Sequence, residues 1–269
     1  MILIKVGGGQ AINWDFIAGD PALKTGKVII VHGANAQMKA LSKDLGFKER
    51  MITSPSGHVS RYTDFRTMEL LTMAYSGLVN TKIVAHLQKS GINAIGLTGA
   101  DGKLWLGKRK EAIVAKAGNK TKMITDSLTG TVVSINTSLI NLLLKENYIP
   151  VITIPAITDM GDLINVDNDR AVAVMVRDLK IEKVVMLFEA PGLLRSPLDE
   201  SSLISHINAQ ELDTFITQTT GRMRKKLLGV KESFANGVKQ VYFGDGRIKN
   251  PVTSALTGKG TVIVSNVEL

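Results

Sequence analysis

The stretch Asn165-Val166-Asp167-Asn168-Asp169-Arg170 places four carboxamide or carboxylate side chains directly before an apolar helical pattern. This pattern predicts a helix over residues 168–179, with the polar cluster at its N-terminus. Free backbone N–H groups and the helix dipole favour anions at such a position, so the stretch is a candidate nucleotide or anion site. Ordinary helix capping is the alternative interpretation, although a cap needs only one such residue.

Two segments further towards the N-terminus end an apolar run in glycine. Residues 2–6 lead into Gly7-Gly8-Gly9, and residues 28–31 lead into His32-Gly33-Ala34-Asn35. Continuous apolar runs are typical of buried parallel strands, whose adjacent ends feed one crevice. We therefore expect the glycine backbone and Lys5 to face a shared phosphate site, with a bare glycine turn as the alternative. Neither a P-loop nor the dinucleotide fingerprint is present.

Strand and helix patterns alternate along the rest of the chain. We predict a long helix over residues 64–90, which Thr63 or Asp64 can cap and Gly91 ends. Further strands are predicted at residues 131–135, 149–155, 183–188, 238–243 and 261–265, and further helices from about Ser201 and from residues 219–226. This alternation indicates an α/β protein with a mainly parallel sheet.

Composition excludes several classes of function. The 269 residues contain no cysteine, which excludes disulfides, thiolate zinc sites and cysteine nucleophiles. The four histidines are scattered, without metal-ligand spacing. No apolar run approaches the roughly 20 residues of a membrane helix, so we predict a cytoplasmic protein without a membrane partner. The net charge of +9 suggests an anionic partner, but only 5% of residues are aromatic and nucleic acid is not expected.

Two basic features accompany these elements. Arg61 precedes the long helix in a polar loop, where it could clamp a carboxylate or simply face solvent. Residues 103–122 carry six lysines and one arginine against the single carboxylate Glu111. That stretch is either a solvated hairpin or loop face, or a docking surface for an acidic macromolecule.

Six short motifs occur in the order found in one known family. They are Lys5 with Gly7-Gly8, Val31-His32-Gly33, Arg61, Asn165-x-x-x-Asp169, Gly221-x-Met223-x-x-Lys226 and Asp245-Gly246-Arg247. The chain thereby resembles the amino acid kinase family over essentially its whole length, and within it the N-acetylglutamate kinase branch. Residues 57–64, Gly-His-Val-Ser-Arg-Tyr-Thr-Asp, are similar to the archaeal kinases that act on aminoadipate or glutamate attached to the small acidic carrier protein LysW.

The resemblance implies a single domain over residues 1–269, a three-layer α/β/α sandwich with a mainly parallel central sheet. Residues 1–165 would form the acceptor lobe and residues 166–269 the ATP lobe. The resemblance assigns catalysis to Lys5, Asp169 and Lys226, acceptor binding to Gly33, Ala34, Arg61 and Asn165, and nucleotide binding to Gly7, Gly8, Asp245, Gly246 and Arg247. It also implies Mg²⁺-ATP with the metal held mainly by phosphate oxygens, no protein metal ligand, and a homodimer built partly on the long helix.

The implied reaction is ATP-dependent phosphorylation of the side-chain carboxylate of LysW-linked aminoadipate or glutamate in lysine or arginine biosynthesis. Such a carboxylate is ionised at pH 7, so no general base is required. Two alternatives are a kinase acting on free N-acetylglutamate and a catalytically silent nucleotide sensor. Two positions depart from the family. Ala34 stands where relatives commonly have glycine, and Phe188-Glu189 replaces a Thr-Asp pair, which leaves the adenine contacts unassigned.

Overall fold

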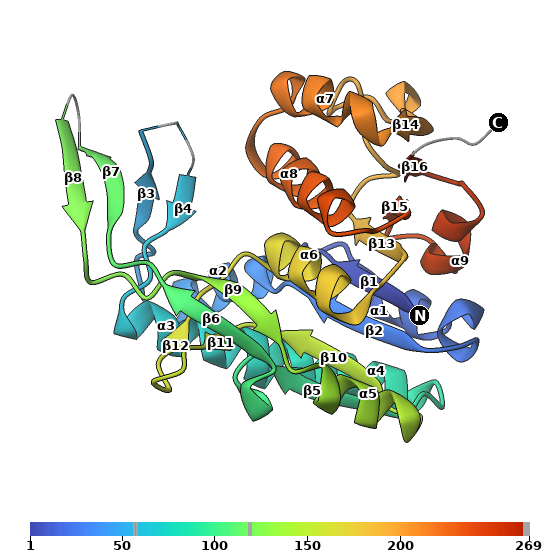
Figure 1. The fold of residues 1–269 in the computed structure, drawn as a ribbon, viewed down its shortest axis with the longest axis horizontal. Helices are drawn as coiled ribbons and strands as arrows, with labels where there is room; N and C mark the ends of the chain where they lie inside the picture. Colours follow the sequence, from blue (N-terminus) through green and yellow to red (C-terminus); the bar gives the residue numbers. More distant parts are fainter. Residues whose placement is uncertain (56, 58, 118–119, 266–269) are drawn as a thin grey trace.

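A sheet of eight strands forms the centre of the computed structural model, which describes residues 1–55, 57, 59–117 and 120–265. The strand order is β14-β16-β15-β13-β1-β2-β10-β5 (Figure 1). The bounds in that order are His206–Asn208, Thr261–Val264, Gln240–Asp245, Lys183–Phe188, Ile2–Val6, Val28–His32, Ile149–Thr153 and Ala94–Thr98.

Neighbouring strands of this sheet run parallel, apart from the antiparallel pair β15–β16. The central strands are buried on both faces, as shown by the fully buried Leu3, Ile4, Ile29 and Ile30. Continuous apolar runs are therefore required here, because helices cover both faces of the sheet. The predicted α/β fold with a mainly parallel sheet is confirmed.

Helices connect and flank these strands (Figure 1). The α-helices are α1 (Trp14–Ala18), α2 (Asn35–Asp44), α3 (Phe65–Thr72), α4 (Thr81–Lys89), α5 (Thr137–Lys145), α6 (Asn168–Leu179), α7 (Leu212–Gln218), α8 (Gly221–Ala235) and α9 (Pro251–Leu256). Short 3₁₀ turns occupy Pro21–Lys24, Asp101–Lys103, Glu200–Ser202 and Ala209–Glu211. The bounds predicted for the helix at residues 168–179 are those of α6.

The predicted long helix is formed by α3, a π-helical segment η2 (Met73–Asn80) and α4 in continuous succession. Asp64 caps it by accepting a hydrogen bond from Thr67 N (2.8 Å), and Gly91 follows its end with φ of +75°. The π-helical segment was not predicted. It places the polar side chains of Tyr75 and Asn80 inside the protein, and such segments often occur at functional sites.

A second sheet and two hairpins are separate from the main sheet. The second sheet has the order β12 (Leu163–Ile164), β11 (Ala156–Ile157), β6 (Trp105–Arg109) and β9 (Gly130–Ile135). The hairpins pair β3 (Met51–Thr53) with β4 (Val59–Arg61) and β7 (Ile113–Ala117) with β8 (Lys120–Ile124). Together the hairpins form an arm that projects from the molecule (Figure 1). A small apolar cluster of Ile52, Tyr62, Ala115 and Ile124 holds the hairpins together.

The helix predicted from about Ser201 is wrong. A single 3₁₀ turn at Glu200–Ser202 is followed by the strand β14, and the next α-helix begins at Leu212. Ile207 is fully buried and pairs with Ile263 of β16. The apolar residues of this region therefore pack at the edge of the sheet and do not form the buried face of a helix.

Within the described ranges, no helix is both long enough and apolar enough to span a lipid bilayer.

Candidate functional site

The carboxyl ends of β1 and β2 lie side by side and bring their glycine turns into contact. Val6 is the register partner of His32, and Gly33 N donates to Val6 O (3.0 Å). A Cβ atom added to Gly8 would lie 2.4 Å from Ala34 N, so position 8 has no room for a side chain. The predicted adjacency of the two strand exits is confirmed, and the close approach gives a physical reason for glycine at position 8.

Ala34 has a negative φ at its position before α2. Its φ is −144°, and its N–H lies at the start of α2. The turn therefore needs no left-handed residue at this point, and the departure from glycine removes no backbone conformation that the turn uses.

Lys5, Asp169 and Lys226 meet beyond the ends of these strands, and we call this group the charge centre. Lys5 Nζ lies 2.5 Å from Asp169 Oδ1, and Lys226 Nζ lies 3.7 Å from Asp169 Oδ2. The three side chains are 8%, 11% and 14% exposed for Lys5, Asp169 and Lys226. One carboxylate thus holds two ammonium groups that come from opposite ends of the sequence.

Three different elements deliver these side chains. Lys5 is on β1, Asp169 is in the first turn of α6, and Lys226 is in the second turn of α8. The helices α6 and α8 pack closely because Gly229 lies against Asp169, where an added Cβ would be 3.0 Å from Asp169 Cβ. A larger residue at position 229 would move α8, and with it the ammonium of Lys226.

The electrostatics of the charge centre are uneven. Burial opposes the charge of Asp169, but the two lysines outweigh it and lower the pKa of this carboxyl to about 2. Burial also lowers the pKa of Lys226, to about 8, because Asp169 only partly offsets burial and Lys5 repels a second positive charge. For Lys5, burial is outweighed by the closer contact with Asp169, and the pKa is raised. The centre carries a net positive charge that an anion would neutralise.

The polar residues that lead into α6 make different kinds of contact. Asp167 is the helix cap and accepts from Asp169 N (2.9 Å) and Arg170 N (3.3 Å). Asn168 Nδ2 donates to His32 O (2.8 Å), which ties α6 to the end of β2. Capping therefore accounts for Asp167, while its neighbours reach into the site.

His32 is a neutral residue that supports the glycine turn at the end of β2. It is fully buried, and burial lowers its pKa to about 4. Asn80 Nδ2 lies 3.0 Å from His32 Nε2, and Nδ1 lies 3.3 Å from Gly33 O. Since the amide nitrogen must donate, Nε2 accepts and Nδ1–H faces the carbonyl. The histidine thus connects the π-helical segment to the glycine turn.

Arg61 and Asn165 lie at the end of the site nearest the arm. Arg61 Nε donates to Glu49 Oε2 (2.9 Å), and Nη2 lies 2.9 Å from the same oxygen. Asn165 Nδ2 donates to Thr63 Oγ1 (2.9 Å), whose hydroxyl donates to Arg61 O (3.4 Å). Arg61 is therefore neither isolated nor solvated. Sequence reasoning missed Glu49, because nothing in the pattern links it to a residue 12 positions away.

Residues 245–247 form a tight turn at the opposite end. Arg247 Nε and Nη2 contact the two oxygens of Asp245 (2.7 and 2.6 Å), and Nη2 also contacts Glu200 (2.7 Å). Gly246 N donates to Phe188 O, and its own carbonyl accepts from Asn13 N. These bonds place the turn beside the glycine loop that follows β1. Glu200 was not predicted as a partner.

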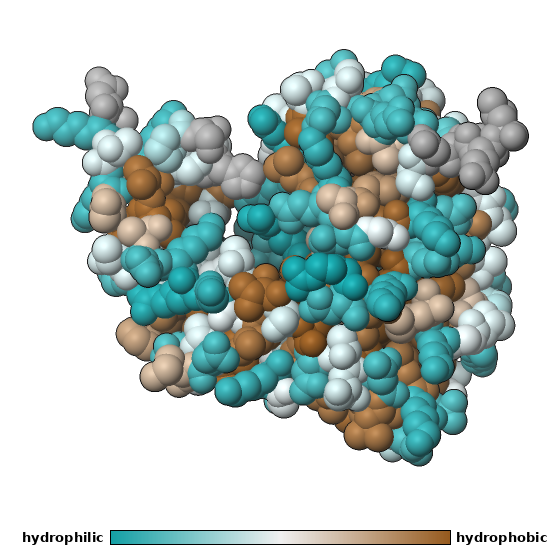
Figure 2. Space-filling view, in the orientation of Figure 1, coloured by the Kyte–Doolittle hydropathy of each residue, from teal (hydrophilic) through white to brown (hydrophobic). Residues whose placement is uncertain are grey.

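The arm and α8 face one another across a notch in the surface (Figure 2). Lys225 Nζ, next to Lys226, crosses to the arm and donates to Val59 O (2.8 Å). Ser56 and His58, which belong to the predicted motif at residues 57–64 and its approach, lie outside the described residues. Lys108 and Lys110 are exposed at the base of the arm, whereas Arg109 donates to Ser127 O and Thr125 O (2.9 Å each).

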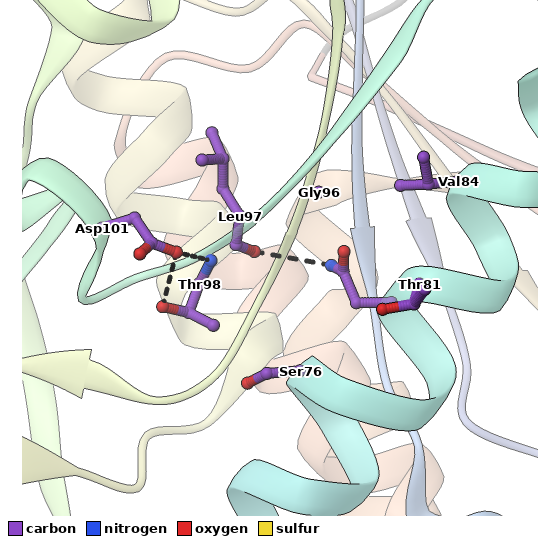
Figure 3. A pocket seen from close by; sticks show the side chains of 8 residues that line it. Ser76, Thr81, Val84, Gly96, Leu97, Thr98 and Asp101 are labelled. Carbon is purple, nitrogen blue, oxygen red and sulfur yellow. Dashed lines mark hydrogen bonds between the residues drawn. The ribbon is translucent and has the colours of Figure 1, made fainter.

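A pocket of about 280 Å³ lies away from the charge centre, at the outer edge of the sheet. It is lined by residues of η2, α4 and β5, including Ser76, Thr81 and Leu97 (Figure 3). Asp101 closes one side by accepting from Thr98 N and Thr98 Oγ1 (Figure 3). None of the predicted site residues lines this pocket.

The described residues contain no group of three or more His, Asp or Glu side chains able to hold a metal ion. Both oxygens of Asp169 already face lysines. A metal at the charge centre would therefore take most of its ligands from a bound anion and from water.

Comparisons with known proteins bear on this geometry. The model of the amino acid kinase family matches residues 1–245. A [LysW]-aminoadipate kinase of Thermus thermophilus is 41% identical over 98% of this chain and 100% of its own. A [LysW]-aminoadipate/[LysW]-glutamate kinase of Saccharolobus islandicus is 35% identical over 98% of this chain and 100% of its own.

Among solved structures, the N-acetylglutamate synthase of Neisseria gonorrhoeae superposes with a TM-score of 0.79. It is 19% identical and covers 99% of this chain and 59% of its own, so this likeness concerns the fold. The family match and the two full-length relatives lead to one conclusion: the chain belongs to the amino acid kinase family.

Proposed function

We propose that this protein transfers the γ-phosphoryl group of ATP to the side-chain carboxylate of aminoadipate, glutamate or both, carried on LysW. The product is an acyl phosphate in lysine or arginine biosynthesis. The observation that carries this proposal is the placement of Asp169 between two buried lysines. The names of the full-length relatives support the acceptor and its carrier.

The reaction needs positioning more than acid or base catalysis. An oxygen of the ionised acceptor carboxylate attacks the γ-phosphorus, the bond to the β–γ bridging oxygen breaks, and ADP leaves with that electron pair. Lys5 and Lys226 offset the negative charge of the two reactants and of the transferring group. Asp169 attracts both ammonium groups, which would otherwise repel each other. Its carboxylate thereby holds them close together in a fixed position.

The remaining residues receive roles according to their place in the site. Gly8 presents its backbone amide to phosphate oxygens, whereas the amides of Gly7 and Gly33 already donate to Leu187 O (2.8 Å) and Val6 O (3.0 Å) and hold the two glycine turns in place. Gly33 and Ala34 are assigned to the acceptor. Asp245, Gly246 and Arg247 lie near the nucleoside. The lobe of residues 1–165 binds the acceptor, and the lobe of residues 166–269 binds ATP. Support comes from the convergence of the β1 and β2 exits with α6 and α8.

Mg²⁺ fits this site as a companion of ATP. The ion keeps several waters and usually binds through phosphates and few carboxylates. Its chemistry would be to neutralise phosphate charge. Lys5 and Lys226 would neutralise charge on the same phosphates.

Arg61 and Asn165 recognise the α-carbon end of the acceptor, with the Arg61 guanidinium taking the α-carboxylate. The lysines of residues 103–122 form a basic surface that attracts the acidic carrier. The exposed Lys108 and Lys110, close to the arm that carries Arg61, support this assignment. The protein acts in the cytoplasm as a homodimer built partly on the helix of residues 64–90, which sedimentation would test.

One assay tests the proposal directly. Purified protein is given Mg²⁺-ATP with LysW carrying aminoadipate, LysW carrying glutamate, or free N-acetylglutamate, and acyl phosphate is trapped with hydroxylamine. Turnover on a loaded carrier is expected. Turnover on free N-acetylglutamate alone would refute the carrier assignment, and ATP binding without hydroxamate from any acceptor would identify a nucleotide sensor.

A further inference from the structure

The carboxylate of Glu49 makes an incomplete contact with Arg61. Both Nε and Nη2 of Arg61 contact the same oxygen, Oε2, at 2.9 Å. The other oxygen, Oε1, is buried and has no hydrogen-bond partner among the residues that the structure describes. The side chains of Arg61 and Glu49 are 12% and 15% exposed, so water has little access to either group.

A second arginine pair in the molecule shows the usual arrangement. Arg170 Nε donates to Glu232 Oε2 (3.1 Å), and Nη2 contacts Oε1 (3.0 Å), so both oxygens are used. The pair at Glu49 is displaced from this geometry and leaves one oxygen open. A buried acceptor without a donor costs roughly 1–3 kcal/mol, and a native structure that keeps one calls for an explanation.

The surroundings of this oxygen suggest an explanation. The main-chain carbonyl of Arg61 is linked through the Thr63 hydroxyl to Asn165, at the acceptor end of the site. Tyr75 also lies here and donates to Asn35 Oδ1 (3.0 Å), at the start of α2. The open oxygen belongs to the carboxylate that holds the Arg61 guanidinium, which the proposed function assigns to the α-carbon end of the acceptor.

A guanidinium beside an unpaired carboxylate oxygen offers donors and an acceptor at neighbouring points. The α-carbon of an amino acid carries the matching groups, a carboxylate and a nitrogen with hydrogen. In a carrier-linked acceptor this nitrogen is an amide with one N–H. We propose that Glu49 determines specificity by accepting a hydrogen bond from the α-nitrogen of the acceptor while it holds Arg61 for the α-carboxylate. This inference rests on the proposed function and extends its acceptor site.

Glu49→Gln tests the proposal, because glutamine has one acceptor oxygen and the proposed role needs two. If that oxygen faces Arg61, the acceptor N–H meets an amide NH₂ instead. We expect the KM for the loaded carrier to rise about tenfold, with kcat and the KM for ATP within about twofold of wild type. A residue that only holds Arg61 would tolerate glutamine, so an unchanged or lower acceptor KM overturns the proposal.

Glu182→Gln is the matched control, since Glu182 pairs with Lys239 (2.6 Å) at the far end of β13 and loses the same charge. A second arm uses the wild-type protein, so it does not depend on how a variant folds. Carrier loaded by chemical ligation with aminoadipate is compared with carrier bearing its N-methyl amide analogue, by calorimetry and by turnover. We expect about tenfold weaker binding of the N-methyl form, and equal affinities would overturn the proposal. Wild-type protein that binds both carriers but forms no acyl phosphate would instead contradict the proposed function.

Discussion

The charge centre and the hairpin arm both concentrate positive charge, but they do so in opposite environments. Lys5 and Lys226 are buried around one carboxylate at 2.5 and 3.7 Å, whereas Lys116, Lys120 and Lys122 on the arm are exposed. Buried charges interact strongly and only at defined geometry, while exposed charges are weakened by water and salt. The centre is thus suited to chemistry and the arm to attraction at a distance.

Breaking the charge centre should have the largest effect. Lys226→Ala removes one of the two ammonium groups to which the proposed function gives the transferring phosphoryl, and we expect kcat/KM to fall roughly 10²–10³-fold. The melting temperature should change little, because Lys5 and Asp169 remain paired. Steady-state kinetics together with thermal melting checks this expectation. Activity within threefold of wild type would remove Lys226 from the mechanism.

The support beneath the centre should respond to acid. Burial lowers the pKa of His32 to about 4 from an ordinary value near 6.5, so between these values the unfolded chain binds a proton that the folded protein excludes. The stability contributed by neutral His32 is complete above pH 6.5 and is lost as the pH falls to 4. The loss amounts to about 3 kcal/mol.

Urea unfolding between pH 7 and pH 4 measures this loss. His32→Asn cannot take up a proton, so its free energy of unfolding should depend less steeply on pH by the same amount. Parallel pH dependences for the variant and the wild type would show that His32 is not the group responsible.

The lowered pKa of Lys226 predicts that kcat/KM falls on the alkaline side of the pH profile, which we call the basic limb. Burial lowers the pKa of Lys226 to about 8, so the free enzyme loses this positive charge above pH 8. We expect kcat/KM for ATP to fall about tenfold per pH unit above that value. Bound phosphate stabilises the ammonium, so the corresponding limb in kcat should lie at higher pH.

Lys226→Arg sharpens this test. Arginine stays protonated throughout the accessible range, so whatever activity the variant retains should lack the basic limb. A limb that persists unchanged would belong to another group.

The basic surface of residues 103–122, from the base of the arm to its tip, should give the smallest effect. Lys108→Glu with Lys110→Glu should raise the KM for loaded LysW about three- to tenfold at low salt, and the difference should shrink as salt screens the charges. Arg109 is left in place because its hydrogen bonds to Ser127 and Thr125 hold the base of the arm.

Lys24→Glu with Lys27→Glu, at the opposite end of β2, makes the same charge change away from the arm. This control should leave the KM for the carrier unchanged. If both double variants weakened carrier binding equally, net charge alone would explain the effect and the arm would have no special part in docking.

The features that could be predicted from the sequence are those set by local pattern. Apolar runs ending in glycine indicated that β1 and β2 end side by side, because parallel strands share an edge. The bounds of α6 followed from its cap and its period. The helix expected from Ser201 failed because a short edge strand with apolar residues looks like part of a helix until its partner β16 is known.

Pairings between distant side chains could not be predicted. Glu49 beneath Arg61, Glu200 beside Arg247 and the π-helical turn that brings Asn80 to His32 depend on tertiary placement. Such contacts produce no repeating pattern of residues in the sequence. The family resemblance supplied roles for Lys5, Asp169 and Lys226, and these roles stay predictions until the kinetic tests are made.

The contact from Lys225 to Val59 has a practical consequence for redesign. Its acceptor is a main-chain carbonyl, so the bond does not depend on which side chain occupies position 59. Hairpins of equal length from relatives with other substrate ranges could be grafted onto this scaffold without altering α8. If the arm sets substrate selectivity as proposed, chimeras of this kind would change it while leaving the neighbouring Lys226 in place.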